Sequence, residues 1–182
     1  MKKLLLLLTI ISSFSCCNND DDNTPTNPID QLPPATQTGE QTFGFLINGE
    51  PFIPPSFGSN SPSAFYQFVD GAYTLGINGS TGGGNTTKFI IIQGLDVDQL
   101  IETNYLLESE NSDKFSAIYS FGGGNIIPQT LITEDENAGT LTITNFDQDN
   151  FIISGTFEFT VLDSNGNNIN ITNGRFDMNY TN

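Results

Sequence analysis

The sequence contains no histidine and no tryptophan, and its 5 lysine and arginine residues are outnumbered by 21 aspartate and glutamate residues. Without histidine the chain cannot carry a Ser-His-Asp triad, a Cys-His pair, or a zinc or iron site that uses imidazole. The formal net charge of −16 opposes nucleic-acid binding, because contact with phosphates requires clustered lysine and arginine. The 182 residues suit one domain with a substantial hydrophobic core.

Long apolar runs are also scarce, and the one of interest lies at the N-terminus. Leu4 to Ile11 is an eight-residue, almost entirely apolar run that follows Lys2 and Lys3. Eight helical residues rise only about 12 Å, which is too short for a bilayer core of about 30 Å. Residues 1–15 are therefore predicted to be a signal peptide rather than a membrane span.

The two cysteines of the chain, Cys16 and Cys17, come directly after this segment. Ser13 to Cys16 resembles the lipobox of bacterial lipoprotein precursors, in which the cysteine is acylated and becomes the new N-terminus. The resemblance predicts lipidation at Cys16, with Cys17 as the alternative, although Ser13 and Phe14 depart from the usual residues. A soluble protein released by an ordinary secretory signal is the other hypothesis. Acyl chains would anchor the protein firmly, since each buried methylene contributes about 0.8 kcal/mol.

Acidic residues follow the cysteines at Asp20, Asp21 and Asp22. This arrangement resembles the export signal of surface lipoproteins in Bacteroidota, and it implies an outer-membrane protein that faces the cell exterior. A solvated acidic tether on the periplasmic face is the alternative. Residues 16–41 are predicted to form a disordered tether, because they are rich in proline, asparagine and threonine and have almost no large apolar residues.

From Thr42 onward apolar and polar residues alternate, as they do in half-buried strands. Asn48-Gly49 and Asp70-Gly71 are the residue pairs favoured in type I′ hairpin turns. Residues 42–182 are therefore predicted to form one all-β domain, an antiparallel β-sandwich or barrel of about 8–11 strands. The predicted strands cover residues 42–48, 50–53, 64–69, 72–77, 88–93, 104–107, 115–121, 129–133, 139–145, 151–162 and 169–180.

Four stretches carry more local expectations. The glycine-rich residues 78–87 are expected to be a loop, and residues 95–102 a short helical turn. The apolar run at 88–93 is expected to be a central strand with both faces covered. In the final strand the apolar side chains change parity across Gly174, which is therefore expected to have a positive φ or to lie in a bulge.

Three motifs occur together in the predicted domain. Residues 43–52 resemble F-x-A-x-V-N-G-x-x-F, residues 139–159 resemble G-x-L-x-I-T-x-x-D followed by I-S-G-T-F-x-F, and residues 171–176 resemble I-T-x-G-x-F. This combination is similar to a group of all-β lipoproteins from flavobacteria and their relatives, and the likeness covers most of residues 42–182. The resemblance implies the fold and the anchor, but no catalytic residue or cofactor. At Asn104 the chain departs from the glycine of the group's G-T-Y step.

Two acidic loops have oxygen-bearing side chains at alternate positions, as calcium-binding loops do. One contains Asp163, Asn165 and Asn167, and the other contains Asp147 and Asp149. The first lacks the glycine at the sixth position and the glutamate at the twelfth position of the helix–loop–helix calcium motif. Both loops also suit the tips of β-hairpins. The expectation is therefore two turns and no cofactor, with Ca²⁺ as the alternative.

Aromatic residues are the candidates for ligand binding. Phe65, Tyr66 and Tyr73 lie with Phe68 on one predicted hairpin. Exposed rings on such a hairpin could stack against a carbohydrate, whereas buried rings would belong to the core, as most phenylalanines of a β protein do. The sequence favours the core interpretation.

Carboxylates on neighbouring strands are the candidates for catalysis. Glu158 and Asp177 could run glycoside hydrolysis without histidine if they lay about 5–10 Å apart in a cleft. Nothing in the sequence marks this pair among the other acids. The glycine stretches at 82–84 and 122–124 lack the lysine and following helix of a phosphate-binding loop.

The sequence thus predicts an outer-membrane lipoprotein with a non-catalytic β domain that has a binding or envelope-structural role. The alternatives are a calycin-like barrel that binds a small apolar ligand and a carboxylate-based glycan hydrolase. The membrane is the expected partner through the anchor, nucleic acid is not, and a glycan, a small ligand and an envelope protein all remain open. Residues 42–182 hold 16 acids and 3 bases, a net −13, which favours a soluble, self-repelling surface.

Overall fold

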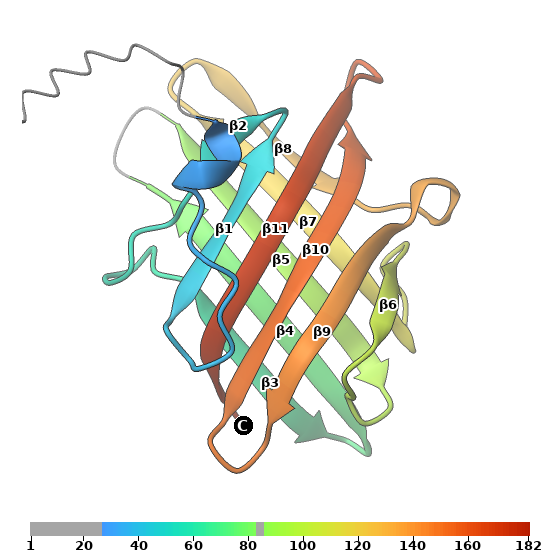
Figure 1. Ribbon diagram of the computed structural model, residues 1–182. Helices are drawn as coiled ribbons and strands as arrows, with labels where there is room; N and C mark the ends of the chain where they lie inside the picture. The colour runs from blue at the N-terminus through green and yellow to red at the C-terminus, as the bar shows by residue number, and fades with distance from the viewer. Residues whose placement is uncertain (1–26, 83–85) are drawn as a thin grey trace, which may run out of the picture.

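A computed structural model describes residues 27–82 and 86–182, which form eleven β-strands and two short 3-10 turns (Figure 1). No helix among these residues is long and apolar enough to cross a bilayer. The prediction of an all-β domain is confirmed. The elements are η1 (Pro28–Gln31), β1 (Thr42–Ile47), β2 (Glu50–Phe52), β3 (Ser63–Val69), β4 (Ala72–Thr81), β5 (Thr87–Val97), β6 (Asn104–Leu107), β7 (Lys114–Gly123), β8 (Ile126–Ile132), η2 (Asp135–Asn137), β9 (Gly139–Asp147), β10 (Ile152–Leu162) and β11 (Asn168–Thr181).

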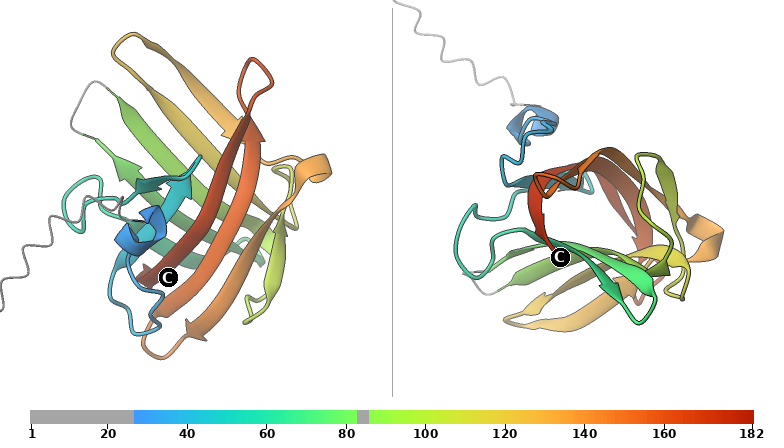
Figure 2. Two further views of the ribbon diagram at one scale, coloured as in Figure 1. Left: turned by 45° about the horizontal axis from the view of Figure 1, so that its top comes forward. Right: turned by 90° about the horizontal axis from the view of Figure 1, so that it is seen from below.

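Eight strands are joined by hydrogen bonds into a closed ring in the order β3-β4-β5-β7-β6-β9-β10-β11. The ring closes where β11 pairs with β3, through Tyr180 opposite Ala64 and Thr181 opposite Phe65. The β1–β2 hairpin extends the sheet from β11, and β8 extends it from β7. Of the two predicted architectures, these pairings therefore form the barrel, and Figure 2 shows its two layers of strands around a common core.

The strand pairs are antiparallel, as predicted, with two exceptions. β11 is parallel to β3, and β6 is parallel to β7 through the single pair Leu107 and Phe115. Both parallel pairs lie where a strand of one layer meets a strand of the other, so they join two antiparallel layers into one mixed sheet.

The interior of the barrel is filled by large side chains that alternate inward along the strands. Phe43 stacks on Phe157 with 5.5 Å between ring centroids, and Phe45 stacks on Phe52 at 4.5 Å. Other fully buried large side chains include Phe176, Leu75, Ile77, Ile90, Ile92, Leu100, Leu107, Leu141, Ile143 and Ile153. This packing makes the interior a hydrophobic core, as expected for a barrel of about eight strands.

Two predicted hairpin turns have the expected geometry. Asn48 and Gly49 have φ values of 50° and 88°, and Asp70 and Gly71 have values of 54° and 99°. Two consecutive positive φ values are the requirement of a type I′ turn, which matches the twist of the flanking strands. The first turn connects β1 to β2, and the second connects β3 to β4.

Two local predictions are wrong. Residues 78–87 are not all loop, because β4 continues to Thr81 and β5 begins at Thr87. Gly79 faces the core there, and a Cβ on it would lie 2.9 Å from the ring of Phe43, so close packing explains this glycine. Residues 95–102 contain no helical turn, since β5 extends to Val97.

The parity change in β11 coincides with a bulge, as predicted. The register against β10 shifts between the pair Phe157–Gly174 and the pair Phe159–Ile171. The positive φ, however, belongs to Asn173, with φ 55°, and not to Gly174. The expectation for 88–93 is confirmed only on the inner face of β5, because the residues on the outer face are half-buried.

Residues 28–41, which the sequence places in the tether, lie against the outside of β1 and β11 (Figure 1). Leu32 is 7% exposed, and Pro33 sits over Gly44, where a Cβ would approach the proline Cδ to 2.7 Å. Arg175 Nη1 donates a hydrogen bond to the Pro33 carbonyl at 3.4 Å. The packed part of the protein therefore begins before Thr42, at about residue 28.

Candidate functional site

Aromatic side chains gather at the end of the barrel that holds the C-terminus and the β3–β4 and β9–β10 turns (Figure 1). We call this group the aromatic end. Its rings form an unbroken series of contacts that links both layers of the barrel. In order, with centroid separations, they are Phe68 to Tyr73 at 4.9 Å, Tyr73 to Tyr66 at 4.7 Å, Tyr66 to Phe146 at 5.1 Å, Phe146 to Tyr180 at 5.5 Å and Tyr180 to Phe151 at 5.7 Å.

The β3–β4 hairpin places half of these rings. Tyr66 and Phe68 share one parity on β3, and the Asp70-Gly71 turn brings Tyr73 directly opposite Phe68. Tyr66 and Tyr73 then lie almost parallel, with 2° between the ring planes. Such a stacked pair gains about 0.5–1.5 kcal/mol beyond its buried area, which favours one fixed arrangement.

The hydroxyl groups of two tyrosines hold the loop that closes this end. The Leu100 N–H donates to the Tyr66 hydroxyl at 2.9 Å, and the Ile101 N–H donates to the Tyr105 hydroxyl at 2.9 Å. Leu100 is 1% exposed and belongs to the hydrophobic core of the barrel. Burial raises the pKa of Tyr66, more than the hydrogen bond from Leu100 lowers it, so this phenol stays neutral.

The outer rings are open to solvent. Phe68 is 63% exposed and Phe151 is 41% exposed, and Val69 beside them is 50% exposed. Phe68 and Phe151 are the two ends of the series of rings, and Tyr66 and Tyr180 between them are each only 6% exposed. Exposed rings at the two edges of a packed aromatic group are candidates for contact with a partner, because aromatic residues are enriched in interfaces. η1 lies beside β2, away from this end of the barrel (Figure 1).

Carboxylates border the rings. The Phe146 N–H donates to Glu102 Oε1 at 3.1 Å, and Asp70 forms the turn beside Phe68 and Tyr73. Burial, and then the negative charge of Asp147, raise the pKa of Tyr180. The aromatic end therefore combines rigid, partly exposed rings with a negative edge.

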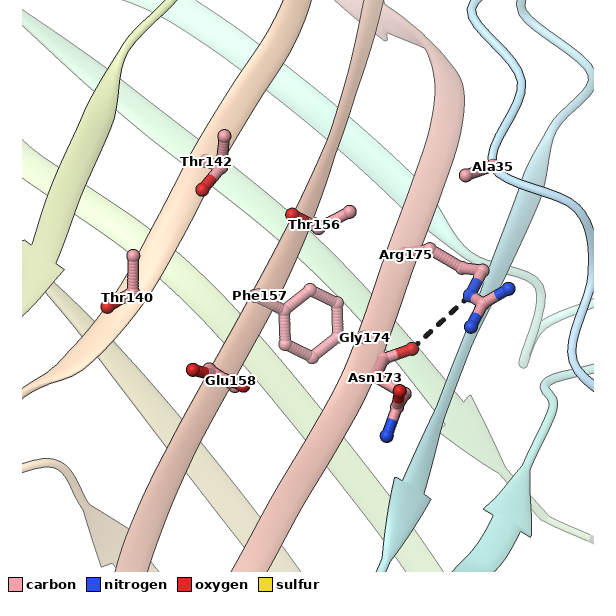
Figure 3. A pocket seen from close by; sticks show the side chains of 9 residues that line it. All are labelled: Ala35, Thr140, Thr142, Thr156, Phe157, Glu158, Asn173, Gly174 and Arg175. Atoms are coloured by element: carbon pink, nitrogen blue, oxygen red, sulfur yellow. Dashed lines mark hydrogen bonds between the residues drawn. The ribbon is translucent and has the colours of Figure 1, made fainter. Parts of the chain in front are cut away.

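A hollow lies on the outer face of β9, β10 and β11 (Figure 3). This outer groove has a volume of about 510 Å³. The Arg175 side chain in its wall already makes hydrogen bonds within the chain. Its Nε donates to the Asn173 carbonyl at 3.3 Å, and its Nη1 donates to the Pro33 carbonyl. The lining side chains in Figure 3 are Ala35, Thr140, Thr142, Thr156, Phe157, Glu158, Asn173, Gly174 and Arg175.

Glu158 and Asp177, the carboxylates considered for hydrolysis, do not face one another. Glu158 is exposed in the outer groove, whereas Asp177 lies opposite Ser154, four residues earlier on β10. Asp177 is fully buried and accepts hydrogen bonds from the N–H groups of Thr38 at 3.0 Å and Gly39 at 2.8 Å. The pair therefore lacks the arrangement that glycoside hydrolysis requires.

Asp177 instead fastens residues 36–40 to the barrel. The Glu40 N–H at 3.2 Å and the Ser154 hydroxyl at 2.7 Å complete its donors. Burial raises the pKa of this carboxyl, but the hydrogen bonds from the Thr38 and Gly39 N–H groups and from the Ser154 hydroxyl outweigh burial and lower the pKa to about 2. A carboxylate with this many donors is the strongest polar contact between the N-terminal segment and the sheet.

The two loops considered for calcium binding are hairpin loops. In each of them the aspartate side chain accepts hydrogen bonds from backbone N–H groups of the same loop. Asp163 Oδ1 accepts from the N–H groups of Asn165 and Asn167, both at 2.8 Å. Asp147 Oδ1 accepts in the same way from Asp149 at 3.0 Å and from Asn150 at 2.9 Å. No group of three or more acidic, cysteine or histidine side chains suited to a metal occurs among residues 27–82 and 86–182.

The three aromatic residues that the sequence suggests for ligand binding do not all lie together in the structure. Tyr66 and Tyr73 meet at the aromatic end, whereas Phe65 faces outward and covers Gly76. The sequence did not indicate Phe146, Phe151 or Tyr180, which come from the other layer. Tyr180 shares the parity of Phe176 and Met178, and this alternation is the sequence feature that places its ring on the inner face of β11. Cys16 and Cys17 lie outside the described residues.

No protein family model matches this chain, and comparisons with curated proteins and with solved structures give no match either.

Proposed function

We propose that this chain is a lipid-anchored outer-membrane protein whose β domain is displayed on the cell exterior and binds a partner through the aromatic end, without catalysis. The single observation that carries the binding role is the series of six contacting rings, two of them well exposed, at one end of a packed barrel. The lipobox-like segment before Cys16 and the resemblance to flavobacterial lipoproteins support the anchor.

The position of the N-terminal segment favours display of the aromatic end. The described chain begins near η1, which lies away from the aromatic end (Figure 1). A tether that starts from this position leaves the rings and their acidic border accessible to the medium. The periplasmic face is the alternative location, and it leaves the same end accessible to envelope proteins.

The packed interior argues for an external binding surface. Large side chains such as Phe43, Phe45 and Ile92 occupy the centre of the barrel, where a calycin-like protein would hold a small apolar ligand. The separation of Glu158 from Asp177 likewise gives no support to a hydrolase. Surface binding is therefore the function with the best support.

Replacing Cys16 with alanine tests the anchor. We expect the variant to lose incorporation of labelled palmitate and to leave the membrane fraction, because no thiol remains to receive the lipid at the cleavage site. Cys17→Ala is the matched control and should keep both properties. Acylation that survives in Cys16→Ala but is lost in Cys17→Ala would move the anchor to Cys17, and survival in both variants would contradict a lipid anchor at this site.

A further inference from the structure

We propose that the aromatic end is the docking surface for a basic, amphipathic peptide segment of a partner protein. This inference rests on the proposed function, because it requires the aromatic end to be the binding surface, and it adds the chemistry of the partner. Three observations carry it: the sign of the charge around the rings, the rigidity of the rings and the spread of the carboxylates.

The charge around the rings is of one sign. Four segments build this end, residues 66–73, 96–105, 145–152 and 178–182, and they contain no lysine or arginine. Their six acidic residues are Asp70, Asp96, Asp98, Glu102, Asp147 and Asp149. A surface with this charge attracts cations over several ångströms and repels anionic surfaces, including other copies of the same acidic chain.

None of the three basic residues of the described chain forms a salt bridge with the six acids of this end. Lys114 lies at the margin of this end, in one hollow with Asp98 and Tyr105, and its salt bridges go to Glu108 and Asp135, each at 3.4 Å. Arg175 lies in the outer groove, and Lys88 lies opposite Phe121, where β5 begins. The turns that carry Asp70 and Asp149, which are separate from Lys114 in the sequence, supply the acids that an external cation can contact.

The rings suit a cation that carries apolar surface. A guanidinium or ammonium group over an aromatic face gains about 0.5–2 kcal/mol, and leucine-like side chains cover the exposed ring edges. Tyr66 is fixed by Leu100, and Tyr73 is stacked on Tyr66, so little ordering remains to be done when a ligand binds. Phe68 and Phe151 supply the exposed faces.

The spread of the carboxylates favours a peptide over a small cation. Asp70 lies on the β3–β4 turn, Asp98 and Glu102 on the loop after β5, Asp147 at the end of β9 and Asp149 on the turn that follows. One ammonium ion can neutralise only one of these positions. An extended segment that alternates basic and apolar residues can reach several of them while its apolar side chains contact the rings.

A labelled peptide of about ten residues that alternates arginine with leucine is the probe, added to the full acylated chain in non-ionic detergent. Fluorescence anisotropy measures its dissociation constant at about 20 and about 200 mM NaCl. We expect Asp70→Asn, Asp98→Asn and Asp149→Asn together to weaken binding about tenfold at the lower salt concentration. We expect Phe68→Ala to weaken it about fivefold at both salt concentrations. These acids are exposed, and their carboxylates make no hydrogen bond in the described structure.

The control variant removes three acids elsewhere. Glu50→Gln, Glu110→Gln and Glu136→Gln together change the net charge equally at exposed positions outside the aromatic end. Binding of the peptide to this variant should stay within about twofold of the wild type. Equal weakening in both triple variants would mean attraction to net charge alone and would overturn the proposal.

Three further ligands test whether the aromatic end binds something other than a basic peptide. A peptide that alternates glutamate with leucine should not bind; if it binds as well as the basic peptide, the proposed charge preference is wrong. Displacement by tetramethylammonium chloride, beyond that caused by NaCl of equal ionic strength, would assign the surface to a small organic cation. A neutral oligosaccharide whose binding depends on Phe68 would overturn the basic peptide but leave the aromatic end as the binding surface. Insensitivity of every ligand to Phe68→Ala would count against the proposed function itself.

Discussion

Replacing Asp177 with alanine is expected to lower the free energy of unfolding by about 3 kcal/mol and to release residues 36–40 from the sheet. The variant loses a buried carboxylate that accepts from three backbone N–H groups and from the Ser154 hydroxyl. Urea unfolding measures the loss, and hydrogen exchange measures the release. The N–H groups of Thr38, Gly39 and Glu40 should exchange much faster in the variant.

Asp163→Ala is the matched control for this change. Asp163 also accepts three hydrogen bonds, but they stabilise a solvent-exposed hairpin loop, where water can replace them. We therefore expect a loss below about 1 kcal/mol. Equal losses in the two variants, or continued protection of the amides of residues 38–40 in Asp177→Ala, would contradict the role of Asp177 as the fastening of the N-terminal segment.

The same contact has a defined pH dependence. The pKa of Asp177 falls from its ordinary value of 3.8 to about 2 in the folded protein. A lowered pKa stabilises the folded state above the ordinary value, and this contribution, about 2 kcal/mol, is lost as the pH falls from about 5 towards 2. The difference in stability between the wild type and Asp177→Ala should therefore shrink over this range.

Replacing Gly155 with alanine is expected to lower the free energy of unfolding by about 3 kcal/mol or to prevent folding. A Cβ at this position would collide with the Thr142 carbonyl oxygen and would approach the Phe176 ring to 2.7 Å. The oxygen belongs to the backbone of β9, so it can move only if the β9–β10 pairing is distorted. Urea unfolding of the purified chain measures the effect.

Gly76→Ala is the informative comparison. A Cβ at Gly76 would also be blocked, but by the side chain of Phe65 on the outer face of the barrel. That ring can turn away, and alanine suits a strand better than glycine, so the loss should be below about 1 kcal/mol. A larger loss in Gly76→Ala than in Gly155→Ala would show that contact with the backbone of β9 is not what requires glycine at position 155.

Local rules predict the hairpins and most strands because those elements depend on neighbouring residues. Asn48-Gly49 and Asp70-Gly71 determine their turns by backbone preference alone, and strict alternation identifies β9 and β10. At Gly79 and Gly174 the local sequence is misleading. Gly79 suggested a loop and Gly174 a positive φ, yet each is glycine because a phenylalanine ring from another strand packs against it.

Long-range contacts explain what the sequence could not predict. The aromatic end joins the β3–β4 hairpin to Phe146, Phe151 and Tyr180, more than 70 residues later in the chain, and no periodicity in the sequence relates them. In the sequence Asp177 looks like any other polar residue on the outer face of a strand. Its burial depends on residues 36–40, which are far away in the sequence and cover it in the fold. The closure of the ring through two residue pairs of β11 and β3 is equally non-local.

Thiol labelling on intact cells tests the central claim, that the aromatic end is displayed on the cell exterior, most directly. Val69 is 50% exposed beside Phe68, so Val69→Cys in a Cys17→Ser chain supplies a single free thiol once Cys16 is acylated. A membrane-impermeant maleimide should label this thiol as fully on intact cells as after lysis. Labelling that occurs only after lysis would contradict the account.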